Sequence, residues 1–144
     1  MIRKQVSHIV PNKRVSRRNG APSTGVQIIA VTGTPGVGKS TLAKELSLFT
    51  KGTYVDLNKL ALKGGLKAGF DRSRAVTIID ERGLYGALKP ILEPNKAYFV
   101  DSHMAHFLPA SKVSLCVVVR CALKTLKTRL KARGYPPAKV DENL

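Results

Sequence analysis

Short apolar runs alternate along this chain with longer segments in which leucines recur every three or four residues. The apolar runs are rich in β-branched residues, which predicts buried strands. We expect four such strands, at residues 26–32, 53–56, 97–101 and 113–120. The leucine spacing predicts amphipathic helices at residues 39–50, 57–67, 81–92 and 123–133. Strands that alternate with helices indicate an α/β fold built on a doubly wound parallel sheet.

Individual positions make this prediction more specific. In the first helix we expect Leu42, Leu46 and Phe49 to share the face that meets the core. Gly64 and Gly65 weaken or end the second helix, because glycine is a poor helix former. The remaining segments are expected to connect these elements: a polar loop at 69–74, an apolar stretch, extended or packed as a loop, at 76–80, and a turn at 93–96.

A phosphate-binding loop is the most specific motif in the chain. The sequence Gly33-Thr34-Pro35-Gly36-Val37-Gly38-Lys39-Ser40 fits G-x-x-x-x-G-K-S/T and stands between a predicted strand and a predicted helix. The glycines Gly33, Gly36 and Gly38 allow successive backbone amides to point inward around phosphate oxygens, beside a helix N-terminus. Lys39 can reach the β- and γ-phosphates, and the Ser40 hydroxyl can ligate Mg²⁺. Nucleotide binding follows from this motif.

Polar side chains follow the other predicted strands. Because ligands bind at the carboxyl ends of parallel strands, we expect Asp56, Asp101 and His103 on the same edge as the loop. Asp101 can hold Mg²⁺ through water, although a capping or ion-pairing role is the alternative. His103 can position water or substrate, or bond to the backbone as a structural histidine. His103 and His106 have no nearby cysteine, so we do not expect a zinc site.

Basic residues crowd the end of the last predicted helix. We expect Arg133 to close over phosphates and stabilise transferred charge, and Arg129 and Lys131 to form a solvated basic face. Arg72 and Arg74 lie in the predicted polar loop. They can clamp a second phosphate-bearing substrate, or simply face solvent.

The charge of the chain favours anionic partners. The 144 residues carry a formal net charge of +16, and RNA is the first candidate partner for such a surface. Residues 1–25 contain no Asp or Glu, and we predict a disordered basic tail there. This tail fits a targeting peptide, a nuclear signal or an RNA-binding arm, but it lacks the apolar core of a secretory signal.

Two further features of composition limit the class of protein. No run of about 18 apolar residues is present, so we expect no membrane partner. Cys116 and Cys121 lie in or beside an apolar run, and we interpret them as reduced core thiols rather than a disulfide pair.

Taken together, the motifs resemble the adenylate kinase isoenzyme six family of small P-loop nucleoside monophosphate kinases. The resemblance is carried by GTPGVGKSTLAKEL, YVDLNKLAL, VDSH, and VVVRC followed by RLKARGY, from about residue 28 to residue 144. It implies a P-loop NTPase domain at 26–144, with a monophosphate-binding region at about 56–79 and a lid at about 132–142.

The resemblance also implies roles for individual residues. Asp101 and His103 correspond to the family's D-x-H pair near Mg²⁺ and water, and Arg133 lies on the ATP phosphates. The ATP-binding residues implied by the motif are Gly36, Gly38, Lys39, Ser40, Thr41 and Arg133. The catalytic residues implied are Lys39, Asp101, His103 and Arg133, and the Mg²⁺ residues are Ser40 and Asp101.

The chain departs from the family pattern at several positions. The family usually has a bulky residue where Ser102 stands inside D-x-H, and an Asp where Ala122 stands. The second change removes a helix N-cap worth about 1 kcal/mol. The family pattern also continues past the lid with a fifth strand and further helices that these 144 residues do not contain.

Three functions are consistent with the sequence. The first is an adenylate kinase that transfers the ATP γ-phosphoryl to AMP or another monophosphate and also hydrolyses ATP. The second is an ATP-driven assembly factor that acts with a small-subunit ribosomal protein during 18S rRNA maturation, as the resemblance implies. The third is an inactive nucleotide- or RNA-binding remnant. The family resemblance implies a nuclear and cytoplasmic location, and the basic tail leaves organelle targeting as the alternative.

Overall fold

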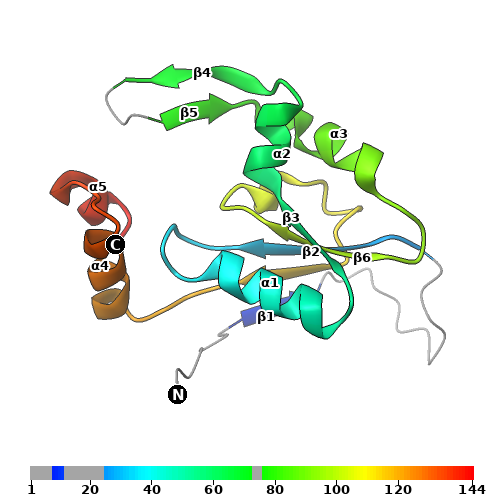
Figure 1. Cartoon of the computed structure of the whole chain (residues 1–144), viewed down its shortest axis with the longest axis horizontal. Helices are drawn as coiled ribbons and strands as arrows, with labels where there is room; N and C mark the ends of the chain where they lie inside the picture. Colours follow the sequence, from blue (N-terminus) through cyan, green and yellow to red (C-terminus); the bar gives the residue numbers. More distant parts are fainter. Residues whose placement is uncertain (1–7, 12–24, 73–75) are drawn as a thin grey trace.

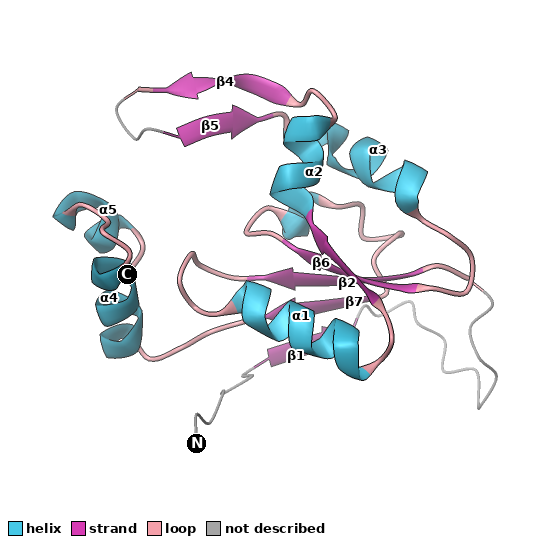
Figure 2. Cartoon of the chain, in the orientation of Figure 1, coloured by secondary structure: helices cyan, strands magenta, loops and turns pink. Residues whose placement is uncertain are grey.

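The structure is a computed structural model that describes residues 8–11, 25–72 and 76–144. Its central sheet has five strands in the order β1-β7-β2-β6-β3. Figure 1 labels β1, β2, β6 and β3, and Figure 2 labels β7. These strands are β1 (His8–Pro11), β7 (Leu115–Val118), β2 (Gln27–Thr32), β6 (Ala97–Asp101) and β3 (Thr53–Asp56). Strands β7, β2, β6 and β3 are mutually parallel, which confirms the predicted parallel sheet.

Strand β1 corrects the prediction for the N-terminal segment. We expected no regular element in residues 1–25, but His8–Pro11 pair antiparallel with β7, from His8 opposite Val118 to Pro11 opposite Leu115. The pairing joins segments that lie more than 100 positions apart in the sequence, so local periodicity cannot reveal it. The rest of the predicted tail, residues 1–7 and 12–24, lies outside the described residues.

Helices cover both faces of the sheet, as the doubly wound class requires (Figure 2). Helix α1 (Lys39–Phe49) packs on one face, and α2 (Leu57–Lys63) and α3 (Leu84–Leu88) pack together on the other. Successive strand residues alternate between the two cores: Ile29 and Phe99 face α1, whereas Ile28 and Tyr98 face α2 and α3. Because both faces of these strands are buried, apolar residues occupy successive positions, and each strand is a continuous apolar run in the sequence.

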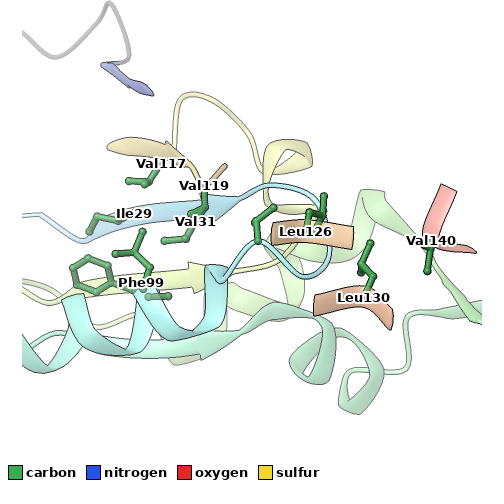
Figure 3. Packing of buried hydrophobic residues seen from close by; sticks show 11 residues of the cluster. Ile29, Val31, Phe99, Val117, Val119, Leu126, Leu130 and Val140 are labelled. Atoms are coloured by element: carbon green, nitrogen blue, oxygen red, sulfur yellow. The ribbon is translucent and has the colours of Figure 1, made fainter. Parts of the chain in front are cut away.

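The core on the α1 side extends to the end of the chain. Helices α4 (Leu123–Ala132) and α5 (Pro137–Glu142) follow β7 and contribute Leu126, Leu130 and Val140 to the same apolar cluster as Val31 and Val119 (Figure 3). Leu130 and Val140 are fully buried. These contacts hold α4 and α5 beside the loop that follows β2.

The face that helix α1 presents to the core agrees with the prediction at Leu42, which is buried, and at Leu46, which packs against the core, but not at Phe49. Phe49 is 88 % exposed, whereas Ala43 and Ser47 are buried with Leu42. Small side chains at positions 43 and 47 let the helix approach the sheet closely, which turns the buried stripe away from Phe49. The spacing of the large apolar residues therefore predicted Leu42 and Leu46 correctly and was wrong for Phe49.

The segment between α2 and α3 is a hairpin rather than a loop. Strands β4 (Lys67–Asp71) and β5 (Val76–Ile79) pair antiparallel as a separate two-stranded sheet. The predicted polar loop at 69–74 is thus wrong for residues up to Asp71, since backbone pairing with β5 overrides the polar composition. Residues 73–75 lie outside the described residues, and the prediction of an extended 76–80 stretch is confirmed for Val76–Ile79.

The remaining elements differ from the predictions mainly at their ends. Helix α2 ends before Gly64, as the glycine pair indicated. The predicted helix at 81–92 is divided into the 3₁₀ turn Glu81–Gly83, α3 and the 3₁₀ turn Lys89–Ile91, which contains Pro90. A further 3₁₀ turn, Ala105–Phe107, follows β6. No helix in the described part of the chain is long and apolar enough to cross a membrane.

Candidate nucleotide-binding site

A cavity of about 410 Å³ lies where the carboxyl ends of β3 and β6 meet the loop after β2. The register aligns these ends, because Asp101 on β6 is opposite both Val31 on β2 and Asp56 on β3. The residues predicted to bind ATP or Mg²⁺ or to act in catalysis all line this cavity: Gly36, Gly38, Lys39, Ser40, Thr41, Asp101, His103 and Arg133. The expectation that Asp56 lies on the same edge as the phosphate loop is also confirmed.

The phosphate loop, residues 33–38, depends on glycine for its path. Gly38 has φ +104° and is the N-cap residue of α1, and Gly36 has φ +91°. A Cβ atom at Gly33 would collide with the backbone carbonyl oxygen of Val119, which cannot rotate away. The loop therefore leaves β2 tightly against the end of β7 and opens onto the N-terminus of α1, where backbone amides and the helix dipole favour an anion.

Lys39 lies over the loop. Its ammonium group donates a hydrogen bond to the Thr34 carbonyl oxygen at 2.9 Å. Partial burial lowers the pKa of Lys39, the positive charge of Arg133 adds to the effect, and the Asp101 carboxylate opposes it. Lys39, Asp101 and Arg133 are thus within electrostatic reach of one another, as a site for phosphate groups requires.

Asp101 is buried and held from β3. The residue is only 6 % exposed. The Tyr54 hydroxyl donates a hydrogen bond to its Oδ2 atom at 3.1 Å. Burial, followed by the Asp101 charge and hydrogen bond, raises the pKa of Tyr54 to about 12. Tyr54 is therefore a neutral donor at physiological pH, and it fixes the orientation of the carboxylate.

The oxygen atoms of Ser40 and Asp101 fit a magnesium site. Mg²⁺ prefers hydroxyl, carboxylate and water oxygens, and both side chains line the cavity beside the phosphate loop. Asp101 Oδ1 has no hydrogen-bond partner among the described residues, so it is available to a metal or its water. When bound, Mg²⁺ would be held by these oxygens and would neutralise negative charge on the phosphates.

His103 lines the cavity and is exposed to solvent on its other side. Its carbonyl oxygen accepts a hydrogen bond from the Thr32 hydroxyl at 3.4 Å. Partial desolvation, then the charges of Lys39 and His106, lower the pKa of His103, and Asp101 opposes them. The imidazole is therefore neutral at pH 7.

Among the described residues, no group of three or more His, Cys, Asp or Glu side chains could hold a metal ion.

Arg129 corrects a prediction about the last helix. We expected a solvated side chain, but its Nη1 atom donates to the carbonyl oxygens of Val37 at 3.1 Å and Gly36 at 3.4 Å. Leu126 and Leu130 would each lie 3.0 Å from a Cβ at Gly36, which shows how closely α4 approaches the loop. Arg129 points to the loop from the same side of α4, whereas Lys131 is exposed as predicted.

The cavity also contains residues that the sequence did not single out. Lys139 and Asn143 line it from α5 and its C-cap, and Tyr135 lines it from the α4–α5 connection. Asn58 lines it from the first turn of α2. The rule that sites lie after strand ends could have identified Asn58, two residues after β3. Arg72 faces solvent and does not line the cavity, and Arg74 lies outside the described residues.

Comparison with known proteins assigns the family. The sequence profile described as "AAA domain" matches residues 29–144, which include the phosphate loop, both carboxylate strands and α4–α5. The chain belongs to the AAA domain family. The α/β P-loop fold class predicted from the sequence is thereby confirmed.

Similar curated proteins make the resemblance more specific. Adenylate kinase isoenzyme 6 homolog FAP7 of Saccharomyces cerevisiae is 38% identical over 117 residues, 81% of this chain and 59% of the relative. Adenylate kinase isoenzyme 6 homolog of Caenorhabditis elegans is 31% identical over 117 residues, 81% of this chain and 64% of the relative. A relative from Methanocaldococcus jannaschii is 35% identical over 116 residues, again 81% and 64%.

These names confirm the resemblance to the isoenzyme six family. The chain spans roughly three fifths of the length of these relatives, from 59% to 64%. What their names say of activity applies to those proteins.

Proposed function

We propose that this chain is a nucleoside monophosphate kinase that transfers the γ-phosphoryl group of Mg-ATP to AMP. The observation that carries the proposal is a single cavity that joins the phosphate loop, Asp101 and Arg133 to Asp56 and Asn58 of the β3–α2 connection. In such a cavity a donor nucleotide would lie on the loop, and the phosphate of an acceptor would lie beside it at the β3–α2 connection. The names of the isoenzyme 6 relatives support the same reaction.

The proposed mechanism needs no protein nucleophile, because phosphoryl transfer depends on positioning and charge neutralisation. The loop amides and Lys39 bind the β- and γ-phosphates, with Gly36, Gly38, Ser40 and Thr41 completing the ATP site. Arg133 approaches from the end of α4 and neutralises charge on the transferred group. Ser40 and Asp101 hold Mg²⁺, directly or through water.

The same site suits an ATPase activity with water as the acceptor. His103 is neutral at pH 7 and lies near Lys39 and Asp101, so it can accept a hydrogen bond from a water molecule. We propose that residues 56–79 bind the monophosphate and that residues 132–142 form a lid, which assigns α2, β4 and β5 to the first region and α5 to the second.

A coupled assay tests the proposed reaction. ADP formation is measured with Mg-ATP alone and with Mg-ATP plus AMP, for the wild-type chain and Lys39→Ala. We expect AMP to stimulate ADP formation, and the variant to lose at least about 100-fold, because an electrostatic contact to the transferred group is removed. If AMP does not stimulate a folded wild-type chain, the kinase proposal is wrong; hydrolysis alone would then leave the ATPase.

RNA binding is a second candidate function, and α4 carries the observation that favours it. Residues 102–140 contain no Asp or Glu. Lys124, Lys127 and Lys131 are exposed on α4 at spacings of three and four, so they form one stripe, the α4 lysine stripe. A single-signed stripe attracts a phosphate backbone through counterion release.

Salt-dependent RNA binding tests this second candidate. Replacing the α4 lysine stripe with glutamates should weaken binding and lower the salt slope by about 2 for three lost contacts to single-stranded RNA. A matched variant changes three other exposed lysines, Lys51, Lys63 and Lys89, to Glu. Equal effects of the two variants would show a dependence on net charge alone and would refute a role for the stripe.

Association with a small-subunit ribosomal protein, 18S rRNA maturation and a nuclear and cytoplasmic location are further proposals. Their support is the family resemblance together with the net charge of +16. Co-sedimentation with small ribosomal subunits, with and without the α4 lysine stripe, is the corresponding test.

A further inference from the structure

Ser102 is one of the most rigidly held side chains of the cavity. It follows β6 directly and is only 3 % exposed. Its backbone N–H donates to Val31 O at 3.2 Å, and its carbonyl oxygen accepts from Ala105 N at 3.2 Å. Its hydroxyl oxygen accepts from Met104 N at 2.9 Å. These bonds anchor Ser102 to β2 and to the turn after β6.

The Ser102 hydroxyl in turn orients Asn58. Ser102 Oγ donates to Asn58 Oδ1 at 2.6 Å, and Asn58 lies in the first turn of α2. Because Met104 N–H already occupies a lone pair of the hydroxyl oxygen, the hydroxyl proton is directed to the Asn58 acceptor. The chain Met104 N–H to Ser102 O–H to Asn58 Oδ1 thus fixes which side of the amide is the acceptor.

The Asn58 amide group is left with two unused donors. Nδ2 has no hydrogen-bond partner among the described residues, and Asn58 lines the cavity. The described residues contain no buried side-chain nitrogen or oxygen without a partner, so the unpartnered Nδ2 atom is not buried. Its N–H groups point away from the Ser102 contact, since Oδ1 and Nδ2 diverge from the same carbon.

We infer that Asn58 Nδ2 donates a hydrogen bond to the phosphate of the acceptor monophosphate, and that Ser102 is the positioning residue for this contact. The inference rests on the proposed kinase function. The acceptor phosphate must come within about 3.5 Å of the transferred phosphorus, so it has to lie in this cavity next to Lys39 and Asp101. Asn58 adjoins Ser102, which directly follows Asp101, and therefore borders that position.

The neutral amide suits this position better than a cation. Asp56 lies two residues before Asn58, and Asp101 lies beside Ser102, with both carboxylates lining the cavity. A lysine or arginine there would pair with these carboxylates, whereas an amide keeps its N–H groups for a phosphate oxygen. The positive charge comes from Lys39 at the start of α1 and from Arg133 at the end of α4.

The variant Asn58→Asp separates a binding role from a structural one. A carboxylate keeps the shape of the side chain and still accepts the Ser102 hydroxyl, but it has no N–H donor. We expect the affinity for AMP, measured by titration calorimetry, and the KM for AMP to weaken at least 10-fold. The affinity for Mg-ATP should change by less than about twofold, because Asn58 lies outside the phosphate loop.

Variants of Ser102 test the positioning step. Ser102→Ala frees the Asn58 amide and should raise the KM for AMP about 3- to 5-fold without changing the KM for ATP. Ser102→Thr keeps the hydroxyl and should restore the wild-type value. The double variant Ser102→Ala with Asn58→Ala should have the same KM for AMP as Asn58→Ala alone, because Ser102 acts only through the contact that Asn58 makes.

The outcomes distinguish this inference from the proposed function. Wild-type AMP affinity in Asn58→Asp, in a chain that binds AMP, would overturn the inference and leave the kinase proposal intact. A melting temperature lowered in both Ser102→Ala and Asn58→Ala, with unchanged AMP binding, would show a purely structural tie between α2 and β6 and would also overturn it. A wild-type chain that binds no AMP would refute both.

Discussion

The side chain of Asp101 is held in place by a tyrosine on the neighbouring strand. It is buried at the end of β6, and only Tyr54 from β3 donates to its Oδ2 atom among the described residues. A buried carboxylate with one oxygen held and the other free is suited to orient a metal-bound water toward a fixed point. Tyr54 is thus expected to act on the metal through Asp101.

Tyr54→Phe tests this coupling. Loss of the hydroxyl removes one hydrogen bond to a charged group, so the free energy of unfolding should fall by about 1–2 kcal/mol. We expect the Mg²⁺ concentration for half-maximal activity to rise about 3- to 10-fold, with a smaller change in KM for ATP at saturating Mg²⁺. The measurement is a Mg²⁺ titration of activity, accompanied by calorimetric binding of ADP with and without Mg²⁺.

Tyr85→Phe is the matched control for Tyr54→Phe. Tyr85 lies on α3, is half-buried and does not line the cavity. The same chemical change at this position should leave the Mg²⁺ requirement unaltered. An unchanged requirement in Tyr54→Phe as well would show that Asp101 does not depend on this hydrogen bond.

At the scale of residues, the sequence identified the parts of the site that belong to a motif or to a strand end. Lys39, Asp101 and Arg133 were found in this way, and all of them line the cavity. The contact of Arg129 with the loop was missed because it joins segments far apart in the chain, and Asn58 was not singled out although it lies two residues after β3. A basic residue on a helix looks the same in the sequence whether it faces water or the carbonyls of Gly36 and Val37.

Among the elements, α4 has an unusual start. Its N-cap residue is Ala122, and no side chain caps its first turn. Its first turn also contains no acidic residue to complement the helix dipole. The sequence predicts that Ala122 leaves this helix without an N-cap, and the structure confirms it.

Ala122→Asp should stabilise the protein. A carboxylate at the N-cap can accept a free backbone N–H and complements the helix dipole, which together contribute about 1 kcal/mol. The expected rise in melting temperature is about 2–4 °C for a chain of this size. Ala132→Asp, at the other end of the same helix, is the control and should be neutral or slightly destabilising. A gain of stability from both variants, or from neither, would contradict the capping argument.

The contact between α4 and the phosphate loop provides the second prediction at this scale. Arg129→Ala removes the hydrogen bonds to the carbonyl groups of the loop and the packing of its aliphatic chain. We expect ATP affinity to weaken about 3- to 10-fold, because the loop loses a contact that fixes its shape. Lys127→Ala, an exposed change on the same helix, should bind ATP as the wild type does.

Calorimetric titration with ATP distinguishes the two variants. If Arg129→Ala and Lys127→Ala retain equal, wild-type affinity, Arg129 does not support the loop. If both lose affinity equally, the effect comes from the net charge of α4.

Sequence periodicity predicted the elements with strong apolar patterns and missed those formed by pairing. The four parallel strands and helix α1 are present close to the expected positions. Strands β1 and β4 were not predicted, because they are short and depend on a partner strand elsewhere in the chain. The exposure of Phe49 on α1 was also missed, since the small residues Ala43 and Ser47 are buried beside Leu42.

In the molecule as a whole, the parallel sheet aligns its carboxyl ends and thereby brings separate segments into one cavity. The phosphate loop follows β2, Asp101 and Ser102 end β6, and Asn58 follows β3. Helices α4 and α5 close the cavity on another side with Arg133 and Lys139. This arrangement places the phosphate loop, Asp101 and Asn58 in one cavity, where the proposed kinase reaction needs a donor and an acceptor side by side.

Transfer of a labelled phosphoryl group from ATP to AMP tests the kinase proposal most directly. The chain is incubated with Mg²⁺, AMP and ATP labelled in its γ-phosphoryl group, and the products are separated. We predict labelled ADP in amounts that depend on AMP, with Lys39→Ala at least about 100-fold slower. Labelled inorganic phosphate as the only product, or no labelled product from a folded chain that binds ATP, would contradict a site built for phosphoryl transfer between nucleotides.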